Sequence, residues 1–150
     1  MQTKRKIAIA IVGLTTFLTI LFIWSNSLKP SSQSQQMSAQ VYGGFANVLD
    51  AVFGKDAISH ALFRKFAHIA EFFVLGVQIS ILFSLIYGFN LKNIVWIFVS
   101  GSMVAIIDES LQNVSKRTAS ITDVLIDILG LSISIIISYA VYYLVKRIKR

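Results

Sequence analysis

The chain contains four long runs of mostly apolar residues. They cover about residues 7–24, 66–85, 94–111 and 124–145. A helix rises about 1.5 Å per residue, so roughly 20 apolar residues cross a hydrocarbon core of about 30 Å. The third run reaches both membrane interfaces only if its helix continues through Asp108 and Glu109. The pattern predicts an all-α membrane protein with four transmembrane helices in one domain, residues 1–150.

The segment between the first and second runs is polar at first and then amphipathic. Ser and Gln dominate its beginning. Apolar residues then recur at helical spacing: Val41, Phe45, Val48, Leu49 and Val52. We expect an interfacial helix in this first outer loop, preceded by a flexible stretch.

Composition and charge point to the same class of protein. The chain is 55% hydrophobic and 14% charged, which is outside the usual range of soluble domains. Its net charge of +7 comes from basic residues that flank apolar runs, a distribution that argues against a nucleic-acid partner. Half of the 14 cations lie at the two ends, in residues 4–6 and 146–150. The lipid bilayer is therefore the expected partner, in a multi-pass cell-membrane protein with both termini in the cytoplasm.

A cleaved signal peptide is the alternative interpretation of the first run. Lys4-Arg5-Lys6 precedes the run, and Ser25-Asn26-Ser27 follows it as a small-x-small site. The run is longer than the 7–15 residues of a usual signal-peptide core, which favours a retained helix. The chain has no cysteine, so disulfides and thiolate chemistry are excluded.

Polar and ionisable residues collect where the runs meet the outer face. With the N-terminus inside, the second run begins there, the third ends there and the fourth begins there. A charge within the membrane costs at least about 2.5–3.5 kcal/mol unless it is paired or hydrated. We therefore expect one polar site around a wet cavity, formed by Lys65, His68, Glu71, Asp108, Glu109, Gln112, Arg117, Asp123 and Asp127.

Two groups of roles can be assigned within this set. The candidates for acid/base catalysis are His68, Glu71, Asp108 and Glu109. The candidates for binding an anion are Lys65 and Arg117, since a guanidinium suits bidentate phosphate recognition.

Three further residues have supporting roles. Gln112 lies one turn after Asp108. Asp123 completes a capping box with Ser120 or belongs to the site, and Asp127 either pairs with Arg117 or takes part in the chemistry. The spacing matches no metal motif, so we predict no metal and no cofactor.

Three motifs in the chain resemble those of the VanZ-like membrane proteins, a family named after a teicoplanin-resistance protein. They are Phe22-Ile-Trp-Ser-Asn-Ser27, then Arg64-Lys-Phe-Ala-His68-Ile-Ala-Glu71-Phe-Phe-Val-Leu-Gly76, and Asp108-Glu-Ser-Leu-Gln112 with Arg117 and Asp123-Val-Leu-Ile-Asp127-Ile-Leu-Gly130. The family pattern usually has Pro-Gly-Arg before the fourth span, where this chain has Ser115-Lys116-Arg117. The resemblance implies a bacterial cell-envelope protein linked to glycopeptide or lipoglycopeptide tolerance.

Three functions remain open. In the first, the outer-face site binds or modifies an anionic envelope group, such as a lipid-linked cell-wall precursor or a phosphate head group. In the second, the chain is a non-catalytic membrane module that alters antibiotic access or partners envelope enzymes. In the third, it is a small proton-coupled carrier, although no inverted repeat supports this. Whether the chain is an enzyme stays open, as does its oligomeric state.

Overall fold

The computed structural model describes residues 2–115 and 120–148 and contains no strand within them. The helices are α1 (Gln2–Ser27), α2 (Ser31–Phe53), α3 (His60–Tyr87), α4 (Leu91–Val114) and α5 (Ile121–Ile148). By length and composition, α1, α3, α4 and α5 can each cross a membrane. The prediction of an all-α membrane protein with four spanning helices is confirmed.

Each predicted run lies inside one of these four helices, and the helices continue beyond the runs. α4 passes through Asp108 and Glu109 to Val114, as the short third run required. α3 begins earlier than its apolar run because Ser59 caps it, and the Ser59 hydroxyl accepts a hydrogen bond from the Leu62 amide at 3.2 Å. Gly88, at φ 77°, ends the same helix in the left-handed region that glycine adopts at low cost.

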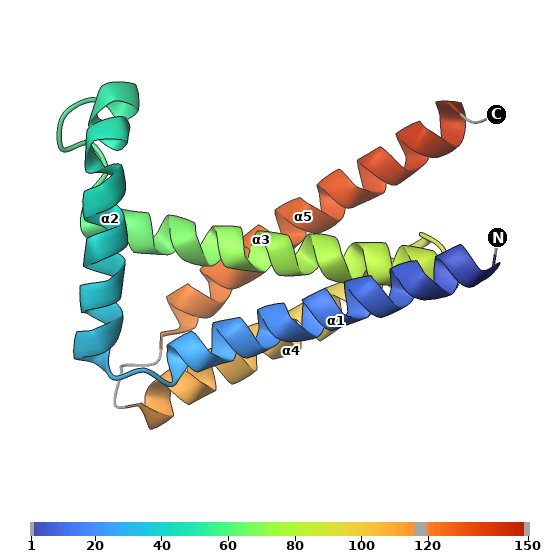
Figure 1. Ribbon diagram of the computed structural model, residues 1–150, viewed down its shortest axis with the longest axis horizontal. Helices are drawn as coiled ribbons and strands as arrows, with labels where there is room; N and C mark the ends of the chain where they lie inside the picture. The colour runs from blue at the N-terminus through green and yellow to red at the C-terminus, as the bar shows by residue number, and fades with distance from the viewer. Residues whose placement is uncertain (1, 116–119, 149–150) are drawn as a thin grey trace.

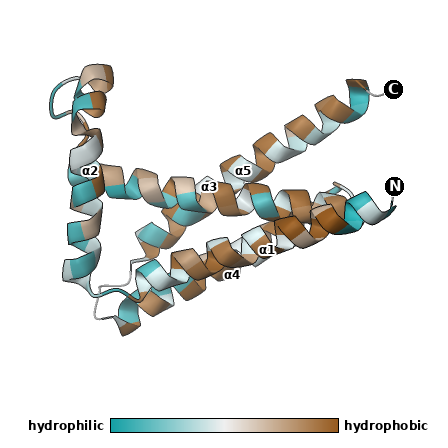
Figure 2. Ribbon diagram, viewed as in Figure 1, coloured by the Kyte–Doolittle hydropathy of each residue, from teal (hydrophilic) through white to brown (hydrophobic). Residues whose placement is uncertain are grey.

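The four spanning helices form a bundle with α3 at its centre. α3 packs most extensively on α5 and also contacts α1 and α4 (Figure 1). Both chain ends lie at the same end of the bundle, where the Arg5 guanidinium donates hydrogen bonds to the carbonyls of Leu85 and Ile86. A cation at a helix C-terminus is stabilising, so Arg5 ties α1 to the end of α3. Figure 2 shows mostly hydrophobic residues along the four spans and hydrophilic ones toward their ends.

Small residues allow the central helices to approach closely. A Cβ atom added at Gly130 would lie 2.3 Å from the backbone oxygen of Ile69, and one at Gly76 would meet the Ser134 hydroxyl. A Cβ at Gly101 would come within 2.6 Å of Leu131. Gly76, Gly101 and Gly130 therefore permit close helix contact within one chain.

α2 runs across the end of the bundle at which α1 ends and α3 begins (Figure 1). The prediction of a flexible stretch before an interfacial helix was wrong, because the helix already begins at Ser31 and includes the Ser- and Gln-rich part. Pro30 occupies the N-cap position, and the Gln, Met and Ala residues that follow are good helix formers. Tyr42 anchors α2 by donating a hydrogen bond to the Ile58 carbonyl and packing against His60 and Phe63.

The apolar side of α2 stays uncovered. Val41, Phe45, Val48 and Val52 are all exposed, and α2 has no buried residue. This is the character expected of a helix that lies in the membrane interface, which remains a prediction.

Candidate functional site

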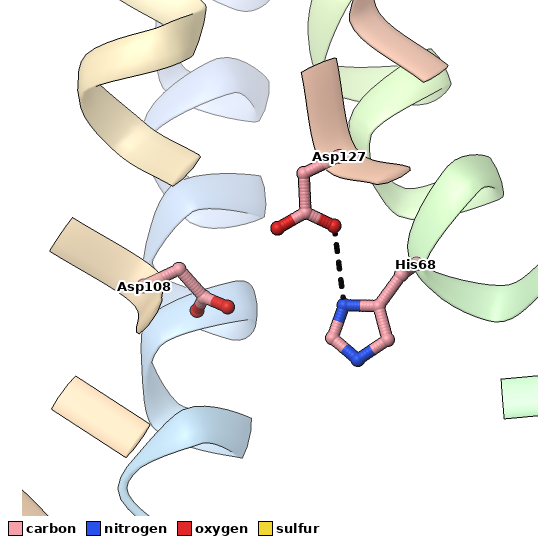
Figure 3. Close-up of side chains that lie close together, drawn as sticks. All are labelled: His68, Asp108 and Asp127. Carbon is pink, nitrogen blue, oxygen red and sulfur yellow. Dashed lines mark ion pairs between the residues drawn. The ribbon is translucent and has the colours of Figure 1, made fainter. Parts of the chain in front are cut away.

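Three ionisable side chains from three different helices meet near the end of the bundle that α2 crosses. His68 of α3 and Asp127 of α5 form an ion pair, with Nδ1 3.3 Å from Oδ1. Asp108 of α4 faces this pair, and Figure 3 shows its carboxylate directed toward the other two side chains. One ligand atom from each of the three residues lies within 4.8 Å of the others. We call His68, Asp108 and Asp127 the central cluster.

The two aspartates are almost completely withdrawn from solvent. Asp108 is 1% exposed and Asp127 is 0% exposed, whereas 23% of the His68 side chain remains accessible. Neither carboxylate oxygen of Asp127 makes a hydrogen bond to a described residue. Because a buried carboxylate is costly without hydrogen bonds, the His68 imidazole is its main source of compensation within residues 2–115 and 120–148.

Asp108 is oriented by neighbours from its own helix and from α1. The Ser27 hydroxyl donates to Oδ1 at 2.6 Å, and the Gln112 amide donates to Oδ2 at 3.1 Å. The Ser115 hydroxyl closes this end of the bundle by donating to the carbonyls of Ser27 and Gln112, both at 2.9 Å. The last turns of α1 and α4 therefore hold the Asp108 carboxylate in one orientation. The supporting role of Gln112 remains a prediction.

Glu109 faces the start of α5 instead of joining the central cluster. Its Oε1 accepts a hydrogen bond from the backbone amide of Ser120, and its Oε2 is buried without a hydrogen-bond partner among the described residues. In a capping box, the Ser120 amide would donate to Asp123. Here that amide donates to Glu109, so a contact between α4 and α5 stands in place of the reciprocal box, which was one of the two roles left open for Asp123.

A cavity of about 310 Å³ opens beside the central cluster, between the end of α1, the start of α2 and the start of α3. His68 and Glu71 line it together with Ser27. Two cationic side chains also line it: Arg64, and Lys29, whose ammonium donates to the Asn26 side chain at 2.8 Å. Since His68 lines the cavity and contacts Asp127, its imidazole connects the open space to the buried carboxylate.

An apolar groove adjoins the cavity. It has a volume of about 440 Å³ and runs between α1 and α3, lined by Leu18, Thr19, Phe22, Ile23, Ala70, Glu71 and Val74. Phe22, Ile23 and Glu71 line both spaces. The cavity, whose wall includes charged side chains, and the apolar groove therefore meet at the Glu71 side chain.

The remaining predicted site residues lie elsewhere or outside the described ranges. Lys65 is exposed and does not line the cavity, whereas its neighbour Arg64 does. Asp123 is half-buried one turn before Asp127 on α5. Arg117, predicted to bind an anion and to pair with Asp127, lies outside the described residues. The structure adds Ser27, Lys29 and Arg64 to the site, of which Ser27 and Arg64 fall in the motifs noted in the sequence.

This arrangement suits proton transfer at the cavity wall. A buried carboxylate behind an imidazole fixes the orientation of the ring and stabilises its protonated form, which prepares the opposite edge for acid/base work. Glu71 lies one helical turn from His68 on the same wall, and a reacting group in the cavity could meet both.

No curated protein and no solved structure matches the chain. A family model does, the one described as VanZ/LLP1, and it covers residues 7–145, which include every residue of the site. The protein with this four-span bundle and this cluster of histidine and carboxylates is thus a member of the VanZ/LLP1 family.

Proposed function

We propose that this cell-envelope protein binds the anionic head group of a lipid-linked envelope molecule at its outer face. A lipid-linked cell-wall precursor or a phosphate head group fits this description. The observation that carries the proposal is that a cavity with Lys29 and Arg64 in its wall adjoins an apolar groove at Glu71. An amphiphile needs both spaces, one for its charged group and one for its hydrocarbon chain.

The cavity offers positive charge to an anion. Lys29 and Arg64 line it from the end of α1 and the start of α3, and both are half-buried. Arg64 can hold a phosphate through two parallel N–H bonds, and partial burial strengthens each charge. Lys65 and Arg117 remain sequence-based candidates for the same role, although Lys65 does not line the cavity and Arg117 lies outside the described residues.

The groove suits a hydrocarbon chain. It is bordered by aliphatic and aromatic side chains of α1 and α3, two helices that face the lipid on their outer sides. A lipid could therefore slide in from the bilayer with its head group entering the cavity. Each buried methylene contributes about 0.8 kcal/mol in water-to-apolar transfer, but a chain that arrives from the bilayer gains little of this. Specificity must then come from the charged cavity.

We further propose that His68, Glu71, Asp108 and Glu109 support chemistry on the bound group. His68, backed by Asp127, exchanges a proton with the ligand, and Glu71 acts from the same wall. Asp108 and Glu109 add negative charge behind His68 and Glu71. In this account, tolerance to glycopeptides or lipoglycopeptides follows from occupying or altering an envelope lipid that these antibiotics depend on.

Binding of a long-chain polyprenyl phosphate to the purified protein tests the proposal. The protein is reconstituted in nanodiscs, and the uncharged polyprenol serves as the matched ligand. We expect the phosphate form to bind at least about tenfold more tightly, which corresponds to 1.4 kcal/mol. Arg64→Gln should remove most of this preference, because it removes a charge from the cavity wall.

Lys55→Gln provides the control, since Lys55 is exposed in the turn between α2 and α3. It should leave binding unchanged. Equal binding of the phosphate and the alcohol, or equal loss of binding in Arg64→Gln and Lys55→Gln, would overturn the head-group site.

A further inference from the structure

We propose that the central cluster binds a divalent transition-metal ion such as Zn²⁺ or Mn²⁺. The ligands would be one imidazole nitrogen of His68 and one carboxylate oxygen each from Asp108 and Asp127. This inference deepens the proposed function. It rests on that function in one respect, the identity of the anion that the metal ion would face. Metal binding itself is measured on the protein alone.

The first argument for a metal site is the spacing of the three ligand atoms. All three lie within 4.8 Å of one another, and His68 Nδ1 and Asp127 Oδ1 are 3.3 Å apart. Metal–ligand bonds of about 2.0–2.2 Å put neighbouring ligand atoms roughly 3–3.5 Å apart. The His68–Asp127 pair already has this spacing, and the ligand atoms of the other pairs, which are at most 4.8 Å apart, can come into range by side-chain rotation.

The second step is the incomplete bonding of Asp127. This side chain is 0% exposed, and neither of its oxygens makes a hydrogen bond to a described residue. Its contact with His68 has the distance of an ion pair but not the geometry of a hydrogen bond. A carboxylate in that position still has lone pairs to offer, and Figure 3 shows the Asp127 carboxylate turned toward the space between His68 and Asp108.

Neighbouring hydrogen bonds provide the support that metal ligands usually have. Asp108 receives one bond from Ser27 and one from Gln112, so its carboxylate is held in place from two sides. Metal-bound carboxylates and imidazoles are commonly fixed in this way, and loss of such a partner weakens metal affinity about 10–100-fold.

The ligand types indicate the class of metal. One imidazole with two carboxylates favours Zn²⁺ or Mn²⁺ over Ca²⁺ and Mg²⁺, which prefer all-oxygen shells. Three protein ligands leave at least one coordination position open, as in catalytic sites. His68 lines the cavity, so an ion can enter from there and face the ligand that the cavity holds. An anionic head group would then complete the coordination, and Glu71 would exchange the proton with it while His68 is bound to the ion.

Metal content of the purified protein tests this inference. The protein is prepared with an affinity tag free of histidine, stripped with EDTA and dialysed against Zn²⁺ or Mn²⁺, without added lipid. Elemental analysis should find about one ion per chain in the wild type. Asp127→Asn and His68→Ala should each lose the ion, and Ser27→Ala should weaken binding about 10–100-fold.

Asp123→Asn is the matched control, because Asp123 lies one turn from Asp127 on the same helix but outside the central cluster. It should bind metal as the wild type does. Titration of the wild type with Co²⁺ gives a readout that needs no folded variant, since nitrogen and oxygen ligation produces a visible absorption spectrum distinct from that of the aqueous ion.

Wild-type protein that retains no stoichiometric Zn²⁺ or Mn²⁺, or variants of the central cluster that retain as much as Asp123→Asn does, would overturn the metal site. Neither result bears on lipid binding. Conversely, a metal-loaded protein that binds the polyprenyl phosphate and the polyprenol equally would contradict the head-group site while leaving the metal site intact.

Discussion

His68 and Asp127 join the two most closely packed helices of the bundle, with Nδ1 of the imidazole 3.3 Å from Oδ1 of the carboxylate. Gly130, three residues after Asp127, lies against Ile69, the residue after His68, because a Cβ added at Gly130 would come within 2.3 Å of the Ile69 carbonyl oxygen. Close approach of α3 and α5 therefore fixes the distance between the two charged groups.

Removal of the imidazole should destabilise the protein. His68→Ala leaves Asp127 buried without its cationic partner, a loss of roughly 3–5 kcal/mol for a fully buried pair. The 23% exposure of the His68 side chain places the expected loss at the lower end, near 3 kcal/mol. The thermal unfolding midpoint in detergent, followed by circular dichroism, measures it.

His60→Ala is the matched control for this change. His60 is on the same helix, and its ring nitrogen shares one hydrogen bond with the Ser38 hydroxyl at 2.8 Å. Losing a neutral hydrogen bond costs about 1 kcal/mol, so His60→Ala should lower the midpoint much less. A smaller effect at His68 than at His60 would show that the ion pair contributes little to the fold.

A methyl group at Gly130 should disturb the α3–α5 contact. Its Cβ would lie 2.3 Å from a backbone oxygen, which is unable to move away without shifting α3. Overpacking of this kind costs about 1–3 kcal/mol. Gly13→Ala on α1 should be neutral, because no atom lies within 4 Å of the added carbon. Equal unfolding midpoints for Gly130→Ala and Gly13→Ala would mean that the helices are farther apart than described.

The first helix should be retained in the mature protein. Cleavage after Ser27 would remove the hydroxyl that donates to Asp108, together with the carbonyl that accepts from Ser115. Intact-mass measurement of protein purified from membranes should therefore yield a species that contains residues 4–29. A mature chain that begins near Leu28 would contradict both this prediction and the described contact.

Both termini should be cytoplasmic, with α2 outside. The basic residues of α1 and α5 lie at the common end of the bundle, and an excess of such residues marks the cytoplasmic side. The chain has no cysteine, so Gln35→Cys and Ile148→Cys each introduce a single reactive thiol. An impermeant thiol reagent should label the first in intact cells but not the second. The reverse labelling pattern would show that the topology is opposite to the predicted one.

The spanning helices could be predicted from the sequence because the bilayer imposes their length. Every backbone polar group must be paired within hydrocarbon, so an apolar run of sufficient length has few alternatives to a helix. The same reasoning fails for α2, whose polar beginning lies outside hydrocarbon. There Pro30 and local helix propensity determine where the helix begins. The Ser- and Gln-rich composition alone wrongly predicted a flexible stretch.

The sequence predicted that the candidate site residues lie near one membrane face, but not which side chains pair with each other. Hydropathy located His68, Asp108 and Asp127 near one membrane face. It gave no means of knowing that His68 would meet Asp127, because that depends on the rotation of α3 against α5. Consecutive residues on a helix point about 100° apart, which explains why Arg64 lines the cavity while Lys65 is exposed. The contact from Ser27 to Asp108 joins residues 81 positions apart, beyond the reach of local pattern.

Antibiotic tolerance conferred by a double variant tests most directly whether the central cluster acts on a ligand. His68→Leu combined with Asp127→Leu replaces the ion pair with apolar side chains, an exchange that is often neutral or stabilising for the fold. Cells that lack the native protein are supplied with the wild type or this variant, and membrane abundance is measured beside the minimal inhibitory concentration of teicoplanin. We predict that the variant is as abundant as the wild type but gives no more tolerance than an empty vector. An abundant double variant that confers full tolerance would contradict a functional role for these charges and leave them as structural.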